Sequence, residues 1–583
     1  MPRQHPAPPA RTVRVATAVA WLAMSSLPAL AARAAGPAAA APAAPAADLV
    51  VLHARVWTGN PAQPEATALA VLHERLVAVG SDAEIRAWRG RGTVTVDARG
   101  LRLVPGFDDA HTHVVGGGAL LTAVQLNDAT SAEEFVRRLA ARAGTLAPGQ
   151  WLLDGNWDET KWSPAALPTR QLIDARVPDR PVAVSRYDGH MIVVNSLALR
   201  LAGITAATRD PVGGEIVRDA AGEPTGALKD AAQDLVMKVV PKPSHAERRA
   251  TIERALKYAA SVGVTSLQDM SDSNLDDDYA TLAVYTELAG EGRLPVRVYA
   301  APSIRATDDL ARLGIRRAFG GPFLRIGALK SFADGSVGSR TAYFFDDFDD
   351  SPGHRGLLSD NVQPLAEATE RMVRADAAGL QLCTHAIGDA GISTILDLYA
   401  EVVRRNGAHE RRWRIEHAQH MAARDFDRFR ELGVIASVQP YHAIDDGRWV
   451  EARIGHDRSS RTYAFRTFLE HGVRLALGTD WPVAPLDPMQ TLYAATTRAT
   501  LDGKHPEGWF AEQKLTITEA LSAYTLGSAY AEFQDRDKGS LEVGKLADFV
   551  LLSADILTLP PARIREARVL KTWVGGRLVY EAR

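Results

Sequence analysis

Two histidines follow a short apolar segment and are separated by a single residue. Residues 105–113 read Pro-Gly-Phe-Asp-Asp-Ala-His-Thr-His, so the pair is His111 and His113. On a strand, residues two apart point to the same side. Two neutral imidazoles at the end of one strand can bind a single cation, because imidazole is a good ligand for zinc and its neighbours. Taken alone, the pair is equally compatible with two hydrogen-bonded core histidines.

Four more residues that can bind metals stand at the ends of later apolar segments: Lys330, His385, His417 and Asp480. Each alone has an ordinary explanation as a hydrogen-bonded histidine, a solvated lysine or a helix-capping aspartate. Their shared position at strand ends instead indicates one site. A buried, charged Lys330 beside a cation would be costly, so we expect a neutral amine that could react with CO₂. The carbamate would be an anionic bridge between two metals.

The segments that must position these residues alternate with amphipathic helical stretches between residue 103 and about residue 530. Such alternation demands parallel pairing through right-handed crossovers. Eight strands closed in this way form a barrel whose active site lies at the carboxyl ends of the strands. The predicted strands are 103–107, 264–268, 296–300, 324–330, 380–385, 413–416, 434–439 and 474–478. The predicted fold class is therefore α/β, a (β/α)₈ TIM-like barrel.

Both ends of the remaining chain have the composition of short strands. Residues 48–104 and 536–583 are rich in Val, Leu and Thr and are interrupted by Gly, Asn and Asp, with a hairpin turn expected at Gly575-Gly576. We predict one small β-sandwich domain made from both ends, with the barrel at 105–535 between them. The interval from about 120 to 243 breaks the barrel rhythm. It is predicted to be an insertion after the first barrel strand, above the catalytic face, as part of a substrate pocket or lid.

The N-terminus has the layout of a secretory signal peptide over residues 1–34. Arg3, Arg11 and Arg14 precede an apolar run, and small residues follow it. The run is shorter than the ~20 residues that a membrane span requires. Residues 35–47 form an Ala/Pro linker. We expect an exported protein, periplasmic or secreted, without a stable membrane span after signal cleavage.

Composition excludes several classes of protein. Of 583 residues, 46% are hydrophobic and 23% are charged, which is typical of a globular enzyme rather than a disordered chain. The net charge of −3 and the lack of a basic run argue against nucleic acid as a partner. Cys383 is the only cysteine, so no intramolecular disulfide can form. A homo-oligomer is compatible with the sequence.

Five motifs together resemble the amidohydrolase superfamily, specifically the amidohydrolase 3 group that includes N-substituted formamide deformylases. They are residues 105–113, 330–336 (Lys-Ser-Phe-Ala-Asp-Gly-Ser), 385–389 (His-Ala-Ile-Gly-Asp), 414–419 (Arg-Ile-Glu-His-Ala-Gln) and 478–482 (Gly-Thr-Asp-Trp-Pro). Residues 539–548 also resemble the return of that group into its small β domain. The resemblance covers essentially the whole chain. Asp108 departs from it, because an apolar residue is usual there.

The resemblance implies a ligand set. His111, His113 and Asp480 would bind one divalent metal, His385 and His417 a second, and Lys330 would bridge them as a carboxylysine. A single-metal version stays open, because an uncarbamylated lysine would leave the second site weak. Zinc is the expected ion, although iron, manganese and cobalt also suit these ligands.

The expected reaction is hydrolysis of a C–N bond in a small-molecule amide, N-formyl or N-acyl amine. A metal acidifies water and polarises the scissile carbonyl. Asp480 would carry the proton from the attacking water to the leaving nitrogen. His190, within the insertion, would contact substrate or the oxyanion, although a structural hydrogen bond in a loop explains it equally well. The further substrate-binding candidates are Gln439, His442, Asp334 and Trp481.

Two other functions are compatible with parts of this pattern. A mononuclear deaminase of the same superfamily would use the same histidines and aspartate. Those deaminases generally place no bridging lysine at the fourth strand, so Lys330 argues against this alternative. A non-catalytic exported protein that binds a metal or ligand is the other candidate. Such a protein has no reason to retain Asp480 as a proton carrier.

Overall fold

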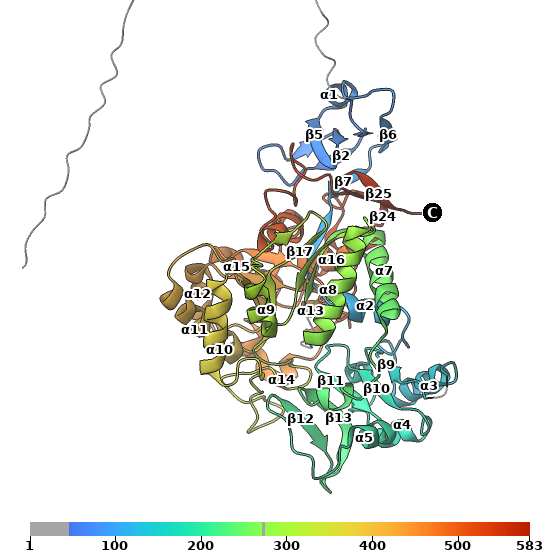
Figure 1. Ribbon diagram of the computed structural model, residues 1–583, viewed down its shortest axis with the longest axis vertical. Helices are drawn as coiled ribbons and strands as arrows, with labels where there is room; N and C mark the ends of the chain where they lie inside the picture. The colour runs from blue at the N-terminus through green and yellow to red at the C-terminus, as the bar shows by residue number, and fades with distance from the viewer. Residues whose placement is uncertain (1–45, 148, 271–274) are drawn as a thin grey trace, which may run out of the picture. The chain divides into compact units, whose positions relative to one another are not determined.

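The computed structural model describes residues 46–147, 149–270 and 275–583 (Figure 1). The predicted signal peptide and nearly all of the predicted linker lie outside these ranges, so export stays a prediction. Ala47, which we placed in the linker, is buried, and its amide donates a hydrogen bond to the Trp88 carbonyl (2.8 Å). The β domain therefore includes this residue. Within the described ranges, none of the helices has the length and apolar character needed to cross a membrane.

A β-sandwich is built from both ends of the chain. One sheet has the order β5-β4-β1-β6 and comes from the N-terminal part; the other has the order β25-β24-β23-β7-β2-β3 and mixes both parts. The strands are β1 (Leu49–Leu52), β2 (Arg55–Trp57), β3 (Glu65–Ala66), β4 (Ala68–Leu72), β5 (Arg75–Gly80), β6 (Val94–Asp97), β7 (Arg102–Pro105), β23 (Phe549–Leu552), β24 (Val569–Val574) and β25 (Arg577–Glu581), with the short helix α1 (Asp82–Arg86) beside them.

The sandwich core confirms that the two sheets pack face to face. Val51 and Leu69 from the first sheet share one apolar cluster with Leu103 and Phe549 from the second. The β24–β25 hairpin turns at Gly575-Gly576, where both residues have positive φ (56° and 70°). That conformation is the one that a two-residue hairpin turn requires and that glycine adopts at low cost.

Eight strand positions form the barrel; β17 and β18 together occupy the fourth, and the short β16 is an antiparallel addition beside β17. Two sheets supply them, with the orders β16-β17-β15-β14-β8 and β18-β19-β20-β21-β22, and all pairs except β16–β17 are parallel. The strands are β8 (Phe107–Thr112), β14 (Val264–Met270), β15 (Arg297–Ala301), β16 (Phe319–Gly320), β17 (Leu324–Ile326), β18 (Ala328–Phe332), β19 (Gln381–Ala386), β20 (Arg414–His417), β21 (Ile435–Val438) and β22 (Leu475–Leu477).

Short β-bridges join the two sheets at the two places where their edges meet: between β8 and the segment after β22, and between the segment after β15 and β18. A parallel bridge pairs Thr112 with Trp481, and another pairs Ser303 with Lys330. At the first seam the Asp480 amide donates to the His111 carbonyl (2.7 Å). At the second the Lys330 amide donates to the Pro302 carbonyl (2.8 Å). The eight positions therefore close into the predicted α/β barrel, and both seams run through residues of the expected site.

Helices follow the barrel strands and lie around the barrel (Figure 1). They are α2 (Val114–Leu120), α7 (His245–Ser261), α8 (Leu275–Gly290), α9 (Thr307–Arg312), α10 (Leu365–Ala377), α11 (Asp389–Asn406), α12 (Asp425–Leu432), α13 (Pro440–Asp446), α14 (Glu451–Ser459), α15 (Phe465–Glu470), α16 (Pro488–Thr497), α17 (Ile517–Ser522) and α18 (Ser528–Ala531). Local signals set several starts; α7, for example, begins after Ser244, which forms a reciprocal capping box with Glu247.

Two strand predictions were wrong in detail. The segment 103–107 does not form the first barrel strand, because the chain passes from the sandwich strand β7 to the barrel strand β8 at Gly106. A Cβ at Gly106 would lie 2.1 Å from Thr265 Oγ1, so only glycine permits this close crossing. The predicted strand 324–330 is divided into β17 and β18 by Gly327, whose φ of 114° breaks the extended backbone. Lys330 therefore lies within β18 and not at its end.

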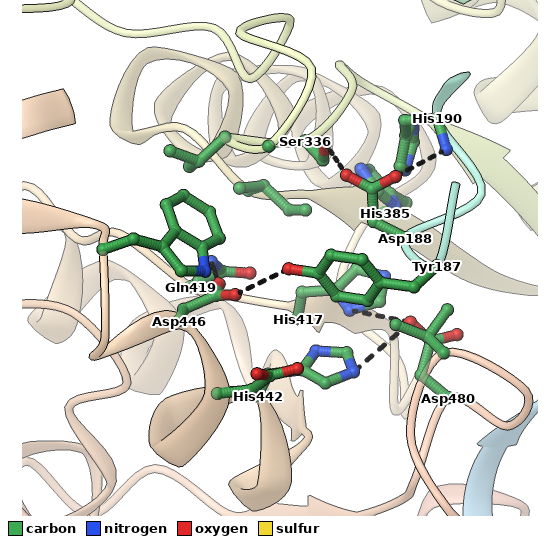
Figure 2. A pocket seen from close by; sticks show the side chains of 16 residues that line it. Tyr187, Asp188, His190, Ser336, His385, His417, Gln419, His442, Asp446 and Asp480 are labelled. Atoms are coloured by element: carbon green, nitrogen blue, oxygen red, sulfur yellow. Dashed lines mark hydrogen bonds and ion pairs between the residues drawn. The ribbon is translucent and has the colours of Figure 1, made fainter. Parts of the chain in front are cut away.

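The insertion after the first barrel strand forms a sheet of its own. Its order is β12-β13-β11-β10-β9. The elements are α3 (Ala132–Ala143), β9 (Leu152–Leu153), α4 (Arg170–Asp174), β10 (Val182–Ser185), β11 (Met191–Val194), α5 (Ser196–Ala202), β12 (Gly214–Arg218), β13 (Pro224–Asp230) and α6 (Asp234–Met237). The turn between β10 and β11 carries Tyr187, Asp188 and His190, and all three reach the barrel mouth (Figure 2).

Candidate metal centre

His111, His113 and Asp480 converge where the first and last barrel strands meet. His111 is in β8, His113 directly follows it, and Asp480 follows β22. Asp480 Oδ1 lies 3.0 Å from His113 Nε2 and 3.5 Å from His111 Nε2. One ligand atom from each residue lies within 4.8 Å of the others, which is compatible with a single metal ion. The sequence-predicted triad is therefore brought together.

A second group shares Asp480. His417, His442 and Asp480 also offer one ligand atom each within 4.8 Å of one another. The His442 Nε2–Asp480 Oδ2 distance is 3.8 Å, and the His417 and His442 rings stack with centroids 6.2 Å apart (Figure 2). His385 lies beside His417, with ring centroids 4.6 Å apart. His442, predicted only as a substrate contact, thus has the position of a ligand as well.

The backbone at two of these positions is unusual. Asp480 has φ 61° and His417 has φ 70°, which place non-glycine residues in the left-handed region. Such conformations cost energy and persist where surrounding structure imposes them, often at functional sites. Here they turn both side chains toward the shared centre.

Lys330 lies among the histidines. It is buried in β18, and its Nζ is 3.1 Å from His111 Nε2 and 4.6 Å from the centre of the Phe332 ring. The position of its amine next to a candidate ligand is compatible with the bridging role that the family resemblance implies.

Burial sets the charge states at the centre. It lowers the pKa values of His111, His385 and His417 well below the ordinary imidazole value, and the charge of Lys330 acts in the same direction. Burial raises the pKa of Asp480, but the electrostatic effect of the neighbouring His111 and His113 side chains outweighs burial and brings that pKa below its ordinary value. Neutral imidazoles around a carboxylate are the donor set that zinc and similar ions require.

A divalent cation fits these residues. Asp480 is only 6% exposed, yet its Oδ1 accepts no hydrogen bond of acceptable geometry from the described residues. The buried His442 Nε2 is in the same situation. Buried polar atoms without partners are costly, and a shared cation would satisfy both.

A pocket opens beside this centre, and both the insertion and the barrel loops line it. Tyr187, Asp188 and His190 come from the insertion, and Gln419 and Asp446 come from barrel segments on the opposite side (Figure 2). Asp188 accepts a hydrogen bond from the Ser336 hydroxyl (2.6 Å), which connects the insertion turn to the barrel, and another from Arg186 Nη1 (2.6 Å) within the turn. The insertion turn therefore forms part of the pocket wall.

His190 is placed in this pocket by a carboxylate that the sequence did not single out. Its Nδ1 donates to Asp230 Oδ1 (2.6 Å), and its ring centroid is 5.0 Å from that of His385. Burial lowers the pKa of His190, but the hydrogen bond and charge of Asp230 raise it above the ordinary value overall. Asp230 ends β13, the strand paired with β11, so only the tertiary fold reveals this contact.

Three predicted substrate residues do not line the pocket. Gln439 instead accepts a hydrogen bond from His417 Nδ1 through its Oε1 (2.8 Å). Asp334 accepts backbone hydrogen bonds from Tyr343, Ile387 and Gly388 and so holds loops together. Trp481 packs against Tyr258, and its carbonyl accepts a hydrogen bond from the His113 amide (2.8 Å). All three act on the structure around the site.

Comparison with known proteins identifies the family. A sequence model of the amidohydrolase family matches residues 94–580. The chain belongs to the amidohydrolase family. This membership confirms the predicted family and the prediction of a metal-dependent hydrolase acting on C–N bonds.

Relatives of this amidohydrolase match over nearly their whole length. Protein LONG AFTER FAR-RED 3 of Arabidopsis thaliana is 37% identical over 91% of both chains. N-substituted formamide deformylase of Arthrobacter pascens is 29% identical over 92% of this chain and 98% of its own. A crystal structure of an uncharacterized metal-dependent hydrolase from Pyrococcus horikoshii has a TM-score of 0.71 at 28% identity, over 88% of this chain and 99% of that one.

Several pocket residues of the amidohydrolase were missed by sequence reasoning. Gln419 follows the candidate ligand His417 by two residues, and Asp446 follows His442 by four. On helix α13, residues four apart share a face, so His442 and Asp446 both line the pocket. That spacing could have indicated Asp446. Tyr187 and Asp188 lie three and two residues before the predicted site residue His190, but only the tertiary fold shows that they line the pocket as well.

Proposed function

We propose that this amidohydrolase hydrolyses an amide, N-formyl or N-acyl amine bond of a small molecule, with one or two divalent cations at the barrel mouth and zinc as the preferred ion. The observation that carries the proposal is Asp480. Its buried Oδ1 accepts no hydrogen bond among the described residues, lies within 3.5 Å of two imidazole nitrogens and belongs to a residue that lines the pocket.

The residues at the centre would act either as metal ligands or as a bridge between two cations. His111, His113 and Asp480 would hold one cation, and His385 and His417 a second, with His442 available as a further ligand. Lys330, as a carbamate, would bridge the two. A divalent cation bound here would act as a Lewis acid that polarises a carbonyl oxygen and acidifies water.

Asp480 is the proposed proton carrier. Its lowered pKa keeps it a carboxylate at neutral pH, and it borders the pocket where substrate would lie. A carboxylate in this position can accept a proton from the attacking water and deliver it to the departing nitrogen. Delivery to nitrogen prevents the expulsion of an unstable amide anion.

His190 is proposed to stabilise the oxygen of the reacting carbonyl. Because its Nδ1 donates to Asp230, the ring is held in place while its other edge is available to the pocket. A donor aimed at a developing negative charge in a buried site lowers the barrier. The Asp230 carboxylate supports this role because it favours the protonated imidazole.

The choice of amide and N-formyl substrates has support from one relative. The Arthrobacter pascens protein, which this chain matches over nearly its full length, is named an N-substituted formamide deformylase. The pocket of this chain combines Trp449 and Ile387 with several carboxylates, so it suits a substrate with both an apolar group and hydrogen-bond donors.

The test is hydrolysis by metal-free and reloaded protein. Chelator-treated protein would be incubated with N-substituted formamides, N-acyl amino acids and aryl amides, before and after addition of Zn²⁺, Mn²⁺ or Co²⁺, and amine release would be measured. We expect turnover only after metal addition. Asp397→Asn, at an aspartate 73% exposed on α11, serves as the surface control for Asp480→Asn. Failure of reloaded wild type to cleave any class would contradict the proposal.

A further inference from the structure

Two charged residues lie directly behind the candidate metal centre, inside the barrel. Arg414 and Glu416 are two apart on β20, so both point into the barrel interior, and both are fully buried. They belong to the motif 414–419, which contains His417, but neither lines the pocket. Their role must therefore be exerted through other side chains.

Glu416 contacts His111, one of the candidate ligands. His111 Nδ1 lies 2.7 Å from Glu416 Oε2. A carboxylate can only accept, so Nδ1 must carry the proton of this hydrogen bond. Nε2 is the opposite edge of the ring and faces the centre, 3.5 Å from Asp480 Oδ1 and 3.1 Å from the Lys330 amine, where a bound cation would require its lone pair.

Arg414 in turn holds Glu416. Arg414 Nε donates to Glu416 Oε1 (2.7 Å) and Nη2 donates to Oε2 (3.0 Å), a two-point contact that stops the carboxylate from rotating. The guanidinium is itself fixed, since it also donates to Gln268 Oε1, to the Ala110 carbonyl and to Ser437 Oγ. The strands β8, β14, β20 and β21 thus all contribute to the orientation of one imidazole.

We propose that Glu416, held by Arg414, is the positioning residue of the metal centre: it fixes the tautomer and orientation in which His111 binds the cation. The inference rests on the proposed function, because it requires a cation at His111. Partners of this kind raise the basicity of a ligating imidazole, and their loss typically costs about 10- to 100-fold in metal affinity.

The test measures metal binding rather than turnover. Metal-free wild type, Glu416→Gln and Glu416→Asp would be titrated with Zn²⁺ against a chromogenic chelator, and Co²⁺-loaded samples would be compared by visible absorption. Glu416→Gln removes the charge that orients Nδ1–H. Glu416→Asp keeps the charge but withdraws the carboxylate by one methylene. Circular dichroism would verify that each variant is folded.

A matched control exists at the opposite side of the barrel strands. Arg297 makes the same two-point contact with Asp548 (2.7 and 2.8 Å), and both residues are buried and line no part of the pocket. Asp548→Asn therefore removes an equivalent carboxylate charge from an equivalent pair. It is expected to leave zinc affinity and the Co²⁺ spectrum unchanged.

We expect both Glu416 variants to bind zinc about 10- to 100-fold more weakly than wild type and to show altered Co²⁺ absorption bands. If folded Glu416→Asp bound zinc as tightly as wild type, the positioning role would be overturned. This outcome is decisive even if Glu416→Gln does not fold. An equal loss in Asp548→Asn would overturn it as well, since the effect would then be general destabilisation. If wild type binds no metal, the proposed function itself fails.

Discussion

Two buried aspartates in this molecule differ in how many hydrogen bonds their carboxylate oxygens accept. At the junction of barrel and sandwich, Asp548 accepts two hydrogen bonds from Arg297 and a third from the Gly575 amide (2.7 Å). At the barrel mouth, Asp480 faces several imidazoles, and its Oδ1 accepts no hydrogen bond from the described residues. Both aspartates are almost equally buried.

This difference distinguishes a buried carboxylate that stabilises the fold from a buried carboxylate that can bind a cation. A buried carboxylate that is paired with an arginine by two hydrogen bonds is already compensated in charge, and removing it would leave the arginine as an uncompensated buried charge. A carboxylate surrounded by neutral imidazoles retains a free lone pair and suits a cation. Substitutions at the two positions should therefore have opposite consequences for activity and stability.

The largest expected effect is at the mouth. Asp480→Asn removes the proposed proton carrier and one metal ligand, so we expect kcat to fall by about 10²- to 10⁴-fold. The measurement is amine release from the best amide or formamide substrate, with Asp397→Asn as control. Retention of near wild-type kcat in a folded Asp480→Asn protein would assign the chemistry to another residue.

Lys330→Ala should have the next largest effect. Without a bridging carbamate the second cation loses its shared ligand, so the protein should lose one metal equivalent, and activity should fall by about 10- to 100-fold. Metal content by atomic emission and kcat on the same sample would test this, with the exposed Lys504→Ala as control. Full activity and full metal content in Lys330→Ala would refute a two-metal centre.

At the junction, Asp548→Asn should act on stability alone. Removal of one partner leaves the buried Arg297 charge uncompensated, so the free energy of unfolding should fall by about 3–5 kcal/mol. Chemical denaturation would measure it. An unchanged free energy of unfolding, or a kcat reduced as strongly as in Asp480→Asn, would contradict the distinction between the two regions.

A smaller effect concerns the pH dependence of that stability. Burial raises the pKa of Asp548, but the charge and hydrogen bonds of Arg297 lower it below the ordinary value overall. A depressed folded-state pKa gives stability that is complete above the unfolded value of ~3.9 and is lost as pH falls through the folded value. The stability gap between wild type and Asp548→Asn should therefore narrow below about pH 4. A gap that is constant down to acidic pH would contradict this explanation.

The grouping of the candidate ligands could be predicted from the sequence because all of them stand at or near the carboxyl ends of barrel strands. The carboxyl ends of parallel strands lie at one face of a barrel, so the sequence alone predicts that His111, His385 and Asp480 lie close together. Contacts that depend on which strands pair, and in which register, could not be predicted from the sequence. His190 contacts Asp230 where β11 pairs with β13, and Gln439 contacts His417 at the ends of the paired strands β20 and β21.

The departure at Asp108 shows the same limit. An apolar residue is usual at this position in the amidohydrolase 3 group, and nothing nearby in the sequence explains a carboxylate. In the fold, Asp108 Oδ2 lies 2.9 Å from Lys538 Nζ, and Asp108 Oδ1 accepts a hydrogen bond from Gln268 (3.1 Å). The partner is more than four hundred residues away along the chain, so only the return of the C-terminal segment reveals the pairing.

The most direct test of the central claim is a crystal structure of the zinc-loaded protein with anomalous scattering recorded on both sides of the zinc edge. We predict one strong anomalous peak bound by His111, His113 and Asp480, a second beside His417, and density for a carboxylate on Lys330 Nζ between them. Absence of an anomalous peak within ligand distance of Asp480, in protein that hydrolyses amides, would contradict the account.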